Sequence, residues 1–179
     1  MKINLNSKKH LLQANRTLAG MVNRIKWEAD FYFLNRRSIT PFEHELSNIE
    51  RAVLYLEDRR FSSHFGVELR MLPRLARRLA AGKRVGGIST IDQQVVRIAR
   101  NRYERSVGRK AGELVFALLL NAHCSKLQIF HYYLHFAYMG YCIQGVEVAS
   151  NILFQKRAIQ LDAEESCFVA ALLARPAPR

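Results

Sequence analysis

The 179-residue sequence is long enough for one domain with a buried core, and its composition, 49% hydrophobic and 24% charged, excludes a disordered chain. Twenty-eight Lys and Arg against 15 Asp and Glu give a formal net charge of +13. This charge favours an anionic partner, and charge alone leaves nucleic acid, a phospholipid surface and a diphosphate substrate open. We find no apolar run long enough for a membrane span and recognise no secretory signal.

The first 40 residues predict a basic amphipathic helix. Apolar residues recur at helical spacing from Leu11 to Ala29, with Arg16, Arg24 and Lys26 beside them. Such a helix either lies on a membrane surface or packs its apolar stripe on the domain core, and both readings stay open. We therefore divide the chain into a basic amphipathic segment, residues 1–40, for which a membrane-peripheral position is one of these two readings, and a domain, residues 41–179.

Further helices are predicted from periodicity and capping residues. Their approximate ranges are 48–58 (capped by Ser47), 68–81, from a cap at Ser89 or Thr90 to 100, 109–123, 126–136, 144–154 and 162–174. No alternating strand is recognised, so the predicted fold class is mainly α. The three cysteines lack the spacing of a disulfide framework or zinc site and are expected to be small buried residues.

Three blocks carry residues suited to chemistry. EDRRFSSHFG (57–66) places two adjacent carboxylates at a helix end, beside arginines and a histidine. GGISTIDQQ (86–94) puts glycines, hydroxyls and amides at a helix start, where phosphate or sugar oxygens can bind. Residues 97–113 are rich in arginine and end at Glu113, whose carboxylate should stay ionised among the cations. Taken singly, each block also fits an ordinary surface ion pair or capped loop.

The order and spacing of the blocks resemble the peptidoglycan glycosyltransferases (glycosyltransferase family 51), as in monofunctional transglycosylases and bifunctional penicillin-binding proteins. EDRRFSSHFG is similar to their EDxxFxxHxG motif, GGISTIDQQ to a glycine-Ser-Thr-x-x-Gln-Gln motif, and RKAGE to RKxxE. The stretch from Ser125 to Ala149 is similar to SKxxILxxYLN with a following GIxxAA. Residues 161–176 follow an LxxxE…A…L…P pattern. The resemblance covers residues 49–176.

This resemblance implies a lysozyme-like, two-lobed helical domain over residues 41–179, shorter at its C-terminus than other members. It implies inverting polymerisation of lipid II into β-1,4-linked glycan strands with release of undecaprenyl diphosphate. A sugar hydroxyl needs a positioned base, and Glu57 matches the family's general base. Glu113 matches the second carboxylate, which is associated with the donor sugar phosphate and with a divalent cation, expected to be Mg²⁺.

The remaining site residues are carried over from matching motif positions. The residues predicted to bind substrate, several of them as cations facing the diphosphate, are Arg60, Ser89, Thr90, Gln93, Gln94, Arg97, Arg105, Arg109 and Lys110. Those predicted to support the first block are Asp58, Phe61, His64 and Gly66. Glu57 and Glu113 are the predicted catalytic residues, and Glu113 is also the predicted metal ligand.

The resemblance also implies partners and a location. We expect lipid II, undecaprenyl-diphosphate-linked glycan, an anionic membrane surface and cell-wall synthesis proteins as partners, at the outer (periplasmic) face of the cytoplasmic membrane. Nucleic acid is not expected. Two alternatives stay open: a catalytically silent member that binds lipid-linked glycan or a cell-wall partner, and a basic helical nucleic-acid binder, which lacks a recognised motif.

The sequence departs from the family pattern at a few positions. Ile88 stands where a small residue is usual, Asp92 replaces Thr or Ser, and Arg97 replaces Lys. His135 replaces the Asn of YLN and shares a helix face with His131, a pair that would need a third ligand to hold a metal. Ile88 and the shorter C-terminus motivate the silent alternative.

Overall fold

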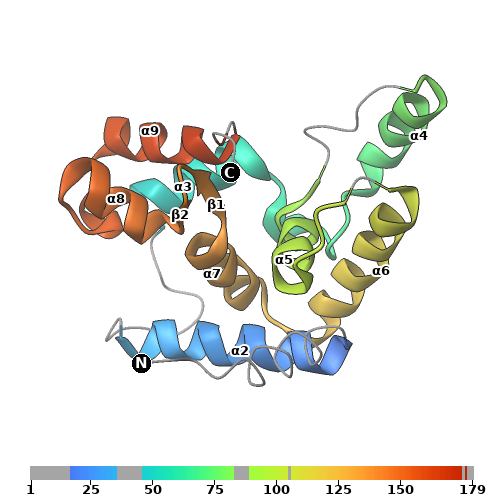
Figure 1. The fold of residues 1–179 in the computed structure, drawn as a ribbon, viewed down its shortest axis with the longest axis horizontal. Coiled ribbons are helices and arrows are strands. Elements are labelled where there is room, and N and C mark those ends of the chain that lie inside the picture. The colour runs from blue at the N-terminus through green and yellow to red at the C-terminus, as the bar shows by residue number, and fades with distance from the viewer. Residues whose placement is uncertain (1–16, 36–45, 83–88, 105, 175, 177–179) are drawn as a thin grey trace.

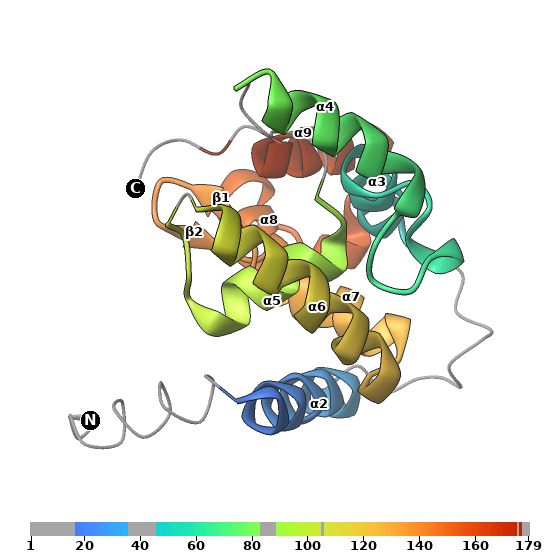
Figure 2. The same cartoon turned by 90° about the vertical axis from the view of Figure 1, so that its right-hand side faces the viewer.

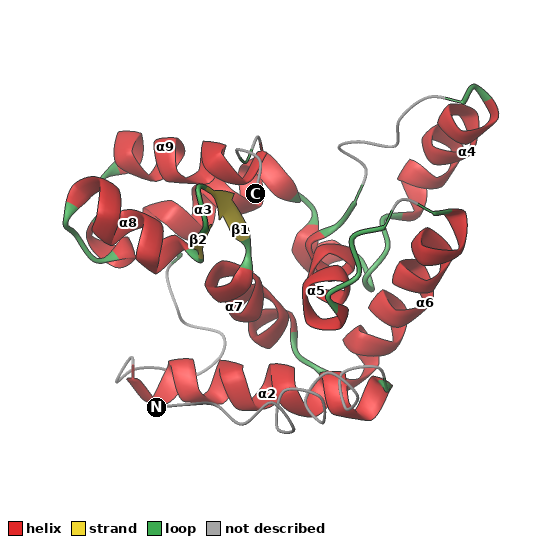
Figure 3. Ribbon diagram, viewed as in Figure 1, coloured by secondary structure: helices red, strands yellow, loops and turns green. Residues whose placement is uncertain are grey.

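The structure, a computed structural model, describes residues 17–35, 46–82, 89–104, 106–174 and 176. Its helices are α2 (Leu18–Asn35), α3 (Asn48–Glu57), α4 (Leu72–Ala80), α5 (Ile91–Arg100), α6 (Val107–His123), α7 (Lys126–Phe136), α8 (Val146–Phe154) and α9 (Ala163–Ala174). Short 3-10 turns lie at Phe61–Ser63, Leu69–Met71 and Ala158–Gln160. Helix dominates the described chain (Figure 3), so the predicted mainly α fold class is confirmed.

Helices α5 and α7 pack together at the centre of the fold (Figure 1). On one side α9 packs against α3 and α8, and on the other lie α4 and α6. Seen from the α4 and α6 side, α6 runs between α4 above and α2 below (Figure 2). Helix α5 contacts both α6 and α7, and this position lets it connect side chains from different parts of the chain.

The apolar stripe of α2 lies in the hydrophobic core. Met21, Val22, Ile25 and Ala29 are buried, and α2 packs against α7 and α6. For these residues the structure shows packing on the core, one of the two readings that the sequence left open. The earlier part of the stripe, from Leu11, lies outside the described residues. In the described part of the chain, every helix is too short or too polar to cross a bilayer.

Side-chain caps begin the helices that carry the site. Thr90 Oγ1 accepts a hydrogen bond from Gln93 N at 3.3 Å at the start of α5. Thr90, rather than Ser89, is therefore the cap, and the Ser89 hydroxyl is used elsewhere. Ser106 caps α6 by accepting from Arg109 N at 3.1 Å, so α6 begins two residues earlier than predicted.

A short antiparallel hairpin corrects the prediction of no strand. Strands β1 (Tyr138–Gly140) and β2 (Ile143–Gln144) pair through an irregular register. Tyr141 and Cys142 form the turn with φ of 49° and 62°, a conformation usually signalled by Asn-Gly. Strands this short cannot show alternation, and the turn lacks its usual residues, so no local pattern predicted the hairpin. Cys142 and Cys167 are exposed, and only Cys124 is buried as expected.

Candidate active site

Glu57, at the C-terminal end of α3, is held by a side chain of α5. Gln94 Nε2 donates a 2.7 Å hydrogen bond to Glu57 Oε2. The same amide accepts at Oε1 from the Tyr133 hydroxyl of α7, at 3.1 Å. Glu57 remains partly exposed. A carboxylate oriented by a neutral donor and reachable from solvent is arranged as a general base requires.

Glu113, on α6, lies among three cations and is only 2% exposed. Arg97 Nε of α5 donates to Glu113 Oε1 at 2.9 Å, and Lys110 Nζ donates to Oε2 at 3.3 Å. Arg109, one turn earlier on α6, also pairs with Oε1. Burial alone would raise the pKa of Glu113, but Arg97, Lys110 and Arg109 together hold this pKa below its ordinary value.

Lys110 connects this cluster to the start of α5. Its Nζ donates to Ser89 Oγ at 2.8 Å and to Gln93 Oε1 at 2.6 Å. Burial lowers the pKa of Lys110, and the neighbouring Glu113 partly offsets that effect. The second and third sequence blocks therefore meet in space.

The cation cluster, which we define as Arg97, Arg109 and Lys110, is suited to binding an anion. Three cations around one carboxylate leave a net positive charge at this place. Arg109 and Lys110 also lie near the N-terminal end of α6, where the helix dipole favours negative charge. A phosphate or diphosphate group is the ligand that this charge and geometry favour.

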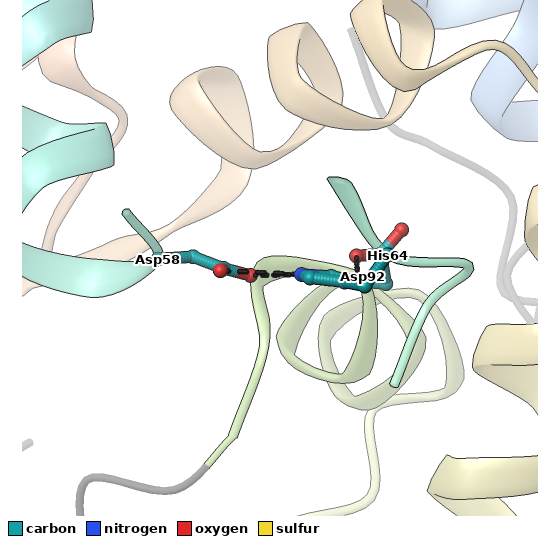
Figure 4. A group of neighbouring side chains, drawn as sticks. All are labelled: Asp58, His64 and Asp92. Carbon is teal, nitrogen blue, oxygen red and sulfur yellow. Dashed lines mark hydrogen bonds and ion pairs between the residues drawn. The ribbon is translucent and has the colours of Figure 1, made fainter. Parts of the chain in front are cut away.

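The first block is tied to α5 by a second set of polar contacts (Figure 4). His64 Nε2 lies 3.0 Å from Asp58 Oδ2, and its Nδ1 lies 3.8 Å from Asp92 Oδ2. Asp58 Oδ2 also accepts from the backbone N–H of Ile91 at 3.1 Å. The loop after Glu57 and the start of α5 are thus held together by charged side chains.

The other two predicted support residues lie in the same loop. Gly66 accepts at its carbonyl a 2.7 Å hydrogen bond from the Thr90 hydroxyl. At φ +81°, with an added Cβ only 2.4 Å from the Ala117 carbonyl oxygen, this position needs glycine. Phe61 is buried, with its ring 5.7 Å from that of Phe130.

Acidic side chains at two places are candidate metal ligands. Asp58, His64 and Asp92 offer ligand atoms within 4.8 Å of one another and could hold a metal ion. Lys126 Nζ already lies 3.0 Å from each carboxylate oxygen of Asp92, however, so an ion there would compete with an ammonium group. Glu113 fits a metal poorly in this state, because its oxygens pair with the cation cluster.

Some predicted residues are not brought into these networks. Arg60 Nε lies 3.3 Å from Glu68 in a half-exposed ion pair. Arg105 and Ile88 lie outside the described residues. His131 is buried with its Nε2 3.6 Å from Glu50, whereas His135 is exposed, and no third ligand joins the two among the described residues.

Three residues of these networks were missed from the sequence. Tyr133 was quoted only as the tyrosine of the YLN motif, and Asn121 is an ordinary polar position near the end of α6. Lys126 was quoted only as part of the SK motif. Asp92 also offered a signal, because a carboxylate in place of the usual Thr or Ser needs a cation or amide nearby once it is buried.

A family model described as transglycosylase matches residues 27–179. The chain belongs to the transglycosylase family. Among curated relatives, this chain is 42% identical over 132 residues to a biosynthetic peptidoglycan transglycosylase of Alcanivorax borkumensis, covering 72% of this chain and 53% of that relative. It is 36% identical over 136 residues to a protein of the same name in Pasteurella multocida, covering 76% and 55%.

A longer protein of the family also matches. The chain is 30% identical over 149 residues to penicillin-binding protein 1F of Bacillus subtilis, covering 83% of this chain and 21% of that protein. The chain thus spans about half the length of the two relatives from Alcanivorax and Pasteurella.

Proposed function

We propose that the chain is a peptidoglycan glycosyltransferase that polymerises lipid II into β-1,4-linked glycan strands, with inversion and release of undecaprenyl diphosphate. The observation that carries this proposal is that two side chains of α5 hold the two carboxylates. Gln94 donates a hydrogen bond to Glu57, and Arg97 donates one to Glu113 within the cation cluster. The names of the relatives support peptidoglycan as the product.

In the proposed reaction Glu57 is the general base. Its carboxylate takes the proton from the 4-hydroxyl of the acceptor N-acetylglucosamine, and that oxygen attacks the anomeric carbon of the donor. The bond from this carbon to the diphosphate oxygen breaks, and the electron pair leaves with undecaprenyl diphosphate. Inversion requires the base and the leaving group on opposite faces of the sugar. Gln94, which holds Glu57, and Arg97, which belongs to the cation cluster, lie one turn apart on α5.

The cation cluster would stabilise the leaving group. Negative charge on the departing diphosphate oxygen increases as the bond breaks. Neutralising this charge with cations therefore matters more than protonating the oxygen. Glu113 holds Arg97, Arg109 and Lys110 together before substrate arrives, which reduces the reorganisation needed when the diphosphate binds. Ser89 and Gln93 extend this site through Lys110.

A divalent cation, expected as Mg²⁺, is proposed only for the substrate-bound state. The diphosphate would then supply the oxygen ligands that Mg²⁺ prefers, which Glu113 alone does not. No step above depends on it. We also propose anionic lipid and cell-wall synthesis proteins as partners at the outer face of the cytoplasmic membrane, since a lipid-linked substrate must be met at a membrane.

The test is polymerisation of labelled lipid II by the full 179-residue chain in lipid vesicles. We expect Glu57→Gln to lower the rate by about 100- to 10,000-fold, because the amide cannot accept the hydroxyl proton. Glu164→Gln, an identical change at an exposed position of α9, should leave the rate unchanged. Polymer formation that survives Glu57→Gln would contradict the assigned base.

The same assay separates the alternatives. A wild-type chain that binds lipid II yet forms no polymer would be the catalytically silent member. A chain that ignores lipid II but binds duplex DNA, with affinity falling steeply as salt rises, would be the nucleic-acid binder.

A further inference from the structure

A second basic pocket lies where α2, the C-terminal end of α5, α7 and the β1–β2 hairpin meet. Its volume is about 490 Å³, and Arg24 of α2, Arg100 of α5 and Tyr132 of α7 are among the residues that line it. No residue of the cation cluster lines this pocket, although Arg97 lies one turn before Arg100 on α5. Positive charge therefore gathers at a second place on the chain, outside the candidate active site.

The two arginines of this pocket have unpaired guanidinium groups. The guanidinium carbon of Arg24 lies 5.4 Å from the ring centre of Phe136, and that of Arg100 lies 4.1 Å from the ring centre of Phe116. In the described part of the chain neither side chain makes a hydrogen bond or ion pair, whereas the arginines of the cation cluster are bound to Glu113. A ring beneath a guanidinium holds its plane in place and leaves the N–H groups at its edge free to bind an oxyanion.

Tyr132 adds a buried hydroxyl that has no partner. The residue is 1% exposed, and neither its hydroxyl nor the buried Nε of Arg100 has a hydrogen-bond partner among the described residues. Burial raises the pKa of Tyr132 to about 12, and the charge of Arg24 partly offsets this effect, which indicates that the two groups lie near each other. The hydroxyl is therefore a donor near neutral pH. A buried donor without a partner costs folding free energy, and a ligand oxygen would offset that cost.

The lining of the pocket carries two positive charges and no carboxylate. Two carboxylates lie nearby without lining it. Glu104 accepts a hydrogen bond from Arg102 Nε at 2.5 Å, so its charge is already neutralised. Glu28, one turn after Arg24 on α2, acts on the Tyr132 hydroxyl but forms no ion pair with that arginine. The pocket itself therefore favours an anion.

We propose that this pocket binds a phosphate ester, with Arg24 and Arg100 pairing with the phosphate oxygens and the Tyr132 hydroxyl donating to one of them. The three donors come from three helices, and a phosphate directs its oxygens tetrahedrally, whereas the two oxygens of a carboxylate share one plane. The volume leaves room beyond a phosphate for a small hydroxylated group such as glycerol. A soluble phosphate ester and a phospholipid headgroup share this chemistry. The proposal does not depend on the proposed function.

The experiment is an NMR titration of the full chain labelled with ¹⁵N-arginine, in which the Nε–H signals are followed as glycerol 3-phosphate is added at constant ionic strength. Arg24→Lys and Arg100→Lys identify the two signals. We expect both signals to shift with one shared, saturating midpoint, and inorganic phosphate to cause similar shifts at higher concentration. The Arg97 signal reports separately on the cation cluster, so binding there is distinguished from binding in the pocket.

Tyr132→Phe should raise the midpoint concentration about 5-fold, as expected for the loss of one hydrogen bond to the phosphate. Its urea unfolding should match that of wild type, because the hydroxyl has no partner among the described residues. Tyr133→Phe is the matched control: it removes the same atom from a buried neighbour that does not line the pocket, and should leave the midpoint unchanged. Shifts of Arg24 and Arg100 that fail to saturate together, or a midpoint that Tyr132→Phe leaves in place, would overturn the proposal.

Co-sedimentation with phosphatidylglycerol vesicles at low salt distinguishes the two sources of the phosphate. Tyr132→Phe leaves the net charge of the chain unchanged, so it does not alter general attraction to an anionic surface. If the pocket takes a lipid headgroup, this variant should need several-fold more lipid for half-sedimentation than wild type and Tyr133→Phe. An equal lipid requirement for all three chains, together with the shifts caused by glycerol 3-phosphate, would assign the pocket to a soluble phosphate ester.

Discussion

Asp92 lies at the second position of α5, is fully buried, and accepts hydrogen bonds from Lys126 at 3.0 Å and from Asn121. Burial lowers the pKa of Lys126, and the charge of Asp92 partly offsets this effect. The family pattern has a neutral hydroxyl residue at this place. The chain therefore carries a buried ion pair that connects α5 to the start of α7. The stability of the folded chain depends on the presence of both partners, because either one alone would be a buried unpaired charge.

We predict that Asp92→Ala lowers the free energy of unfolding by roughly 3 kcal/mol, because Lys126 loses its counter-ion while remaining largely covered. Lys126→Met should destabilise by a similar mechanism, through the unpaired carboxylate. In urea unfolding, the double variant should lose less than the sum of the single losses. Strictly additive losses would show that the two groups do not interact.

Glu113 makes stability depend on acid pH. Because the pKa of Glu113 is lowered in the folded chain, its stabilising contribution is fully present above its unfolded pKa of about 4.3 and is lost as pH falls through the folded value. We expect the stability gap between wild type and Glu113→Gln, measured by urea unfolding, to be widest near neutral pH and to shrink below about pH 4. A gap independent of pH would mean that the carboxylate charge contributes nothing.

At the scale of the elements, helices were predictable because their signals are local. Thr90 is one of the two caps predicted for α5, and the apolar period of each helix identifies its buried face. The hairpin depends on features that only the fold reveals. At Gly145, which precedes α8, an added Cβ would lie 2.3 Å from the His135 carbonyl oxygen, a close approach between segments that no local pattern announces.

The candidate site was predictable in its residues but not in its pairings. Motif order named Glu57, Gln94 and Glu113, and helix geometry places Gln93 and Gln94 about 100° apart, so they face different partners. Which partners those are depends on how α3, α6 and α7 pack around α5. Tyr133 is the tyrosine of the YLN motif, but a tyrosine inside an apolar stripe is interpreted as core until its hydroxyl has a partner.

For the whole molecule, the net charge of +13 and the buried stripe of α2 bear on membrane contact together. Met21, Val22, Ile25 and Ala29 are buried in the core, so this stripe is not available for insertion between lipids. Attraction of the basic chain to anionic headgroups then becomes the main expected contribution from the described residues. Such attraction is screened by salt, whereas insertion of apolar side chains is not.

We therefore predict that the chain co-sediments with phosphatidylglycerol vesicles at low salt, that phosphatidylcholine vesicles leave it in solution, and that about 0.5 M NaCl releases most of it. Each basic residue near an anionic surface contributes about 1 kcal/mol, so a few contacts suffice for binding without a penetrating helix. Binding to both vesicle types that persists at high salt would instead show that apolar side chains enter the bilayer. In that case charge would direct the chain to the membrane surface, and burial of apolar side chains would hold it there.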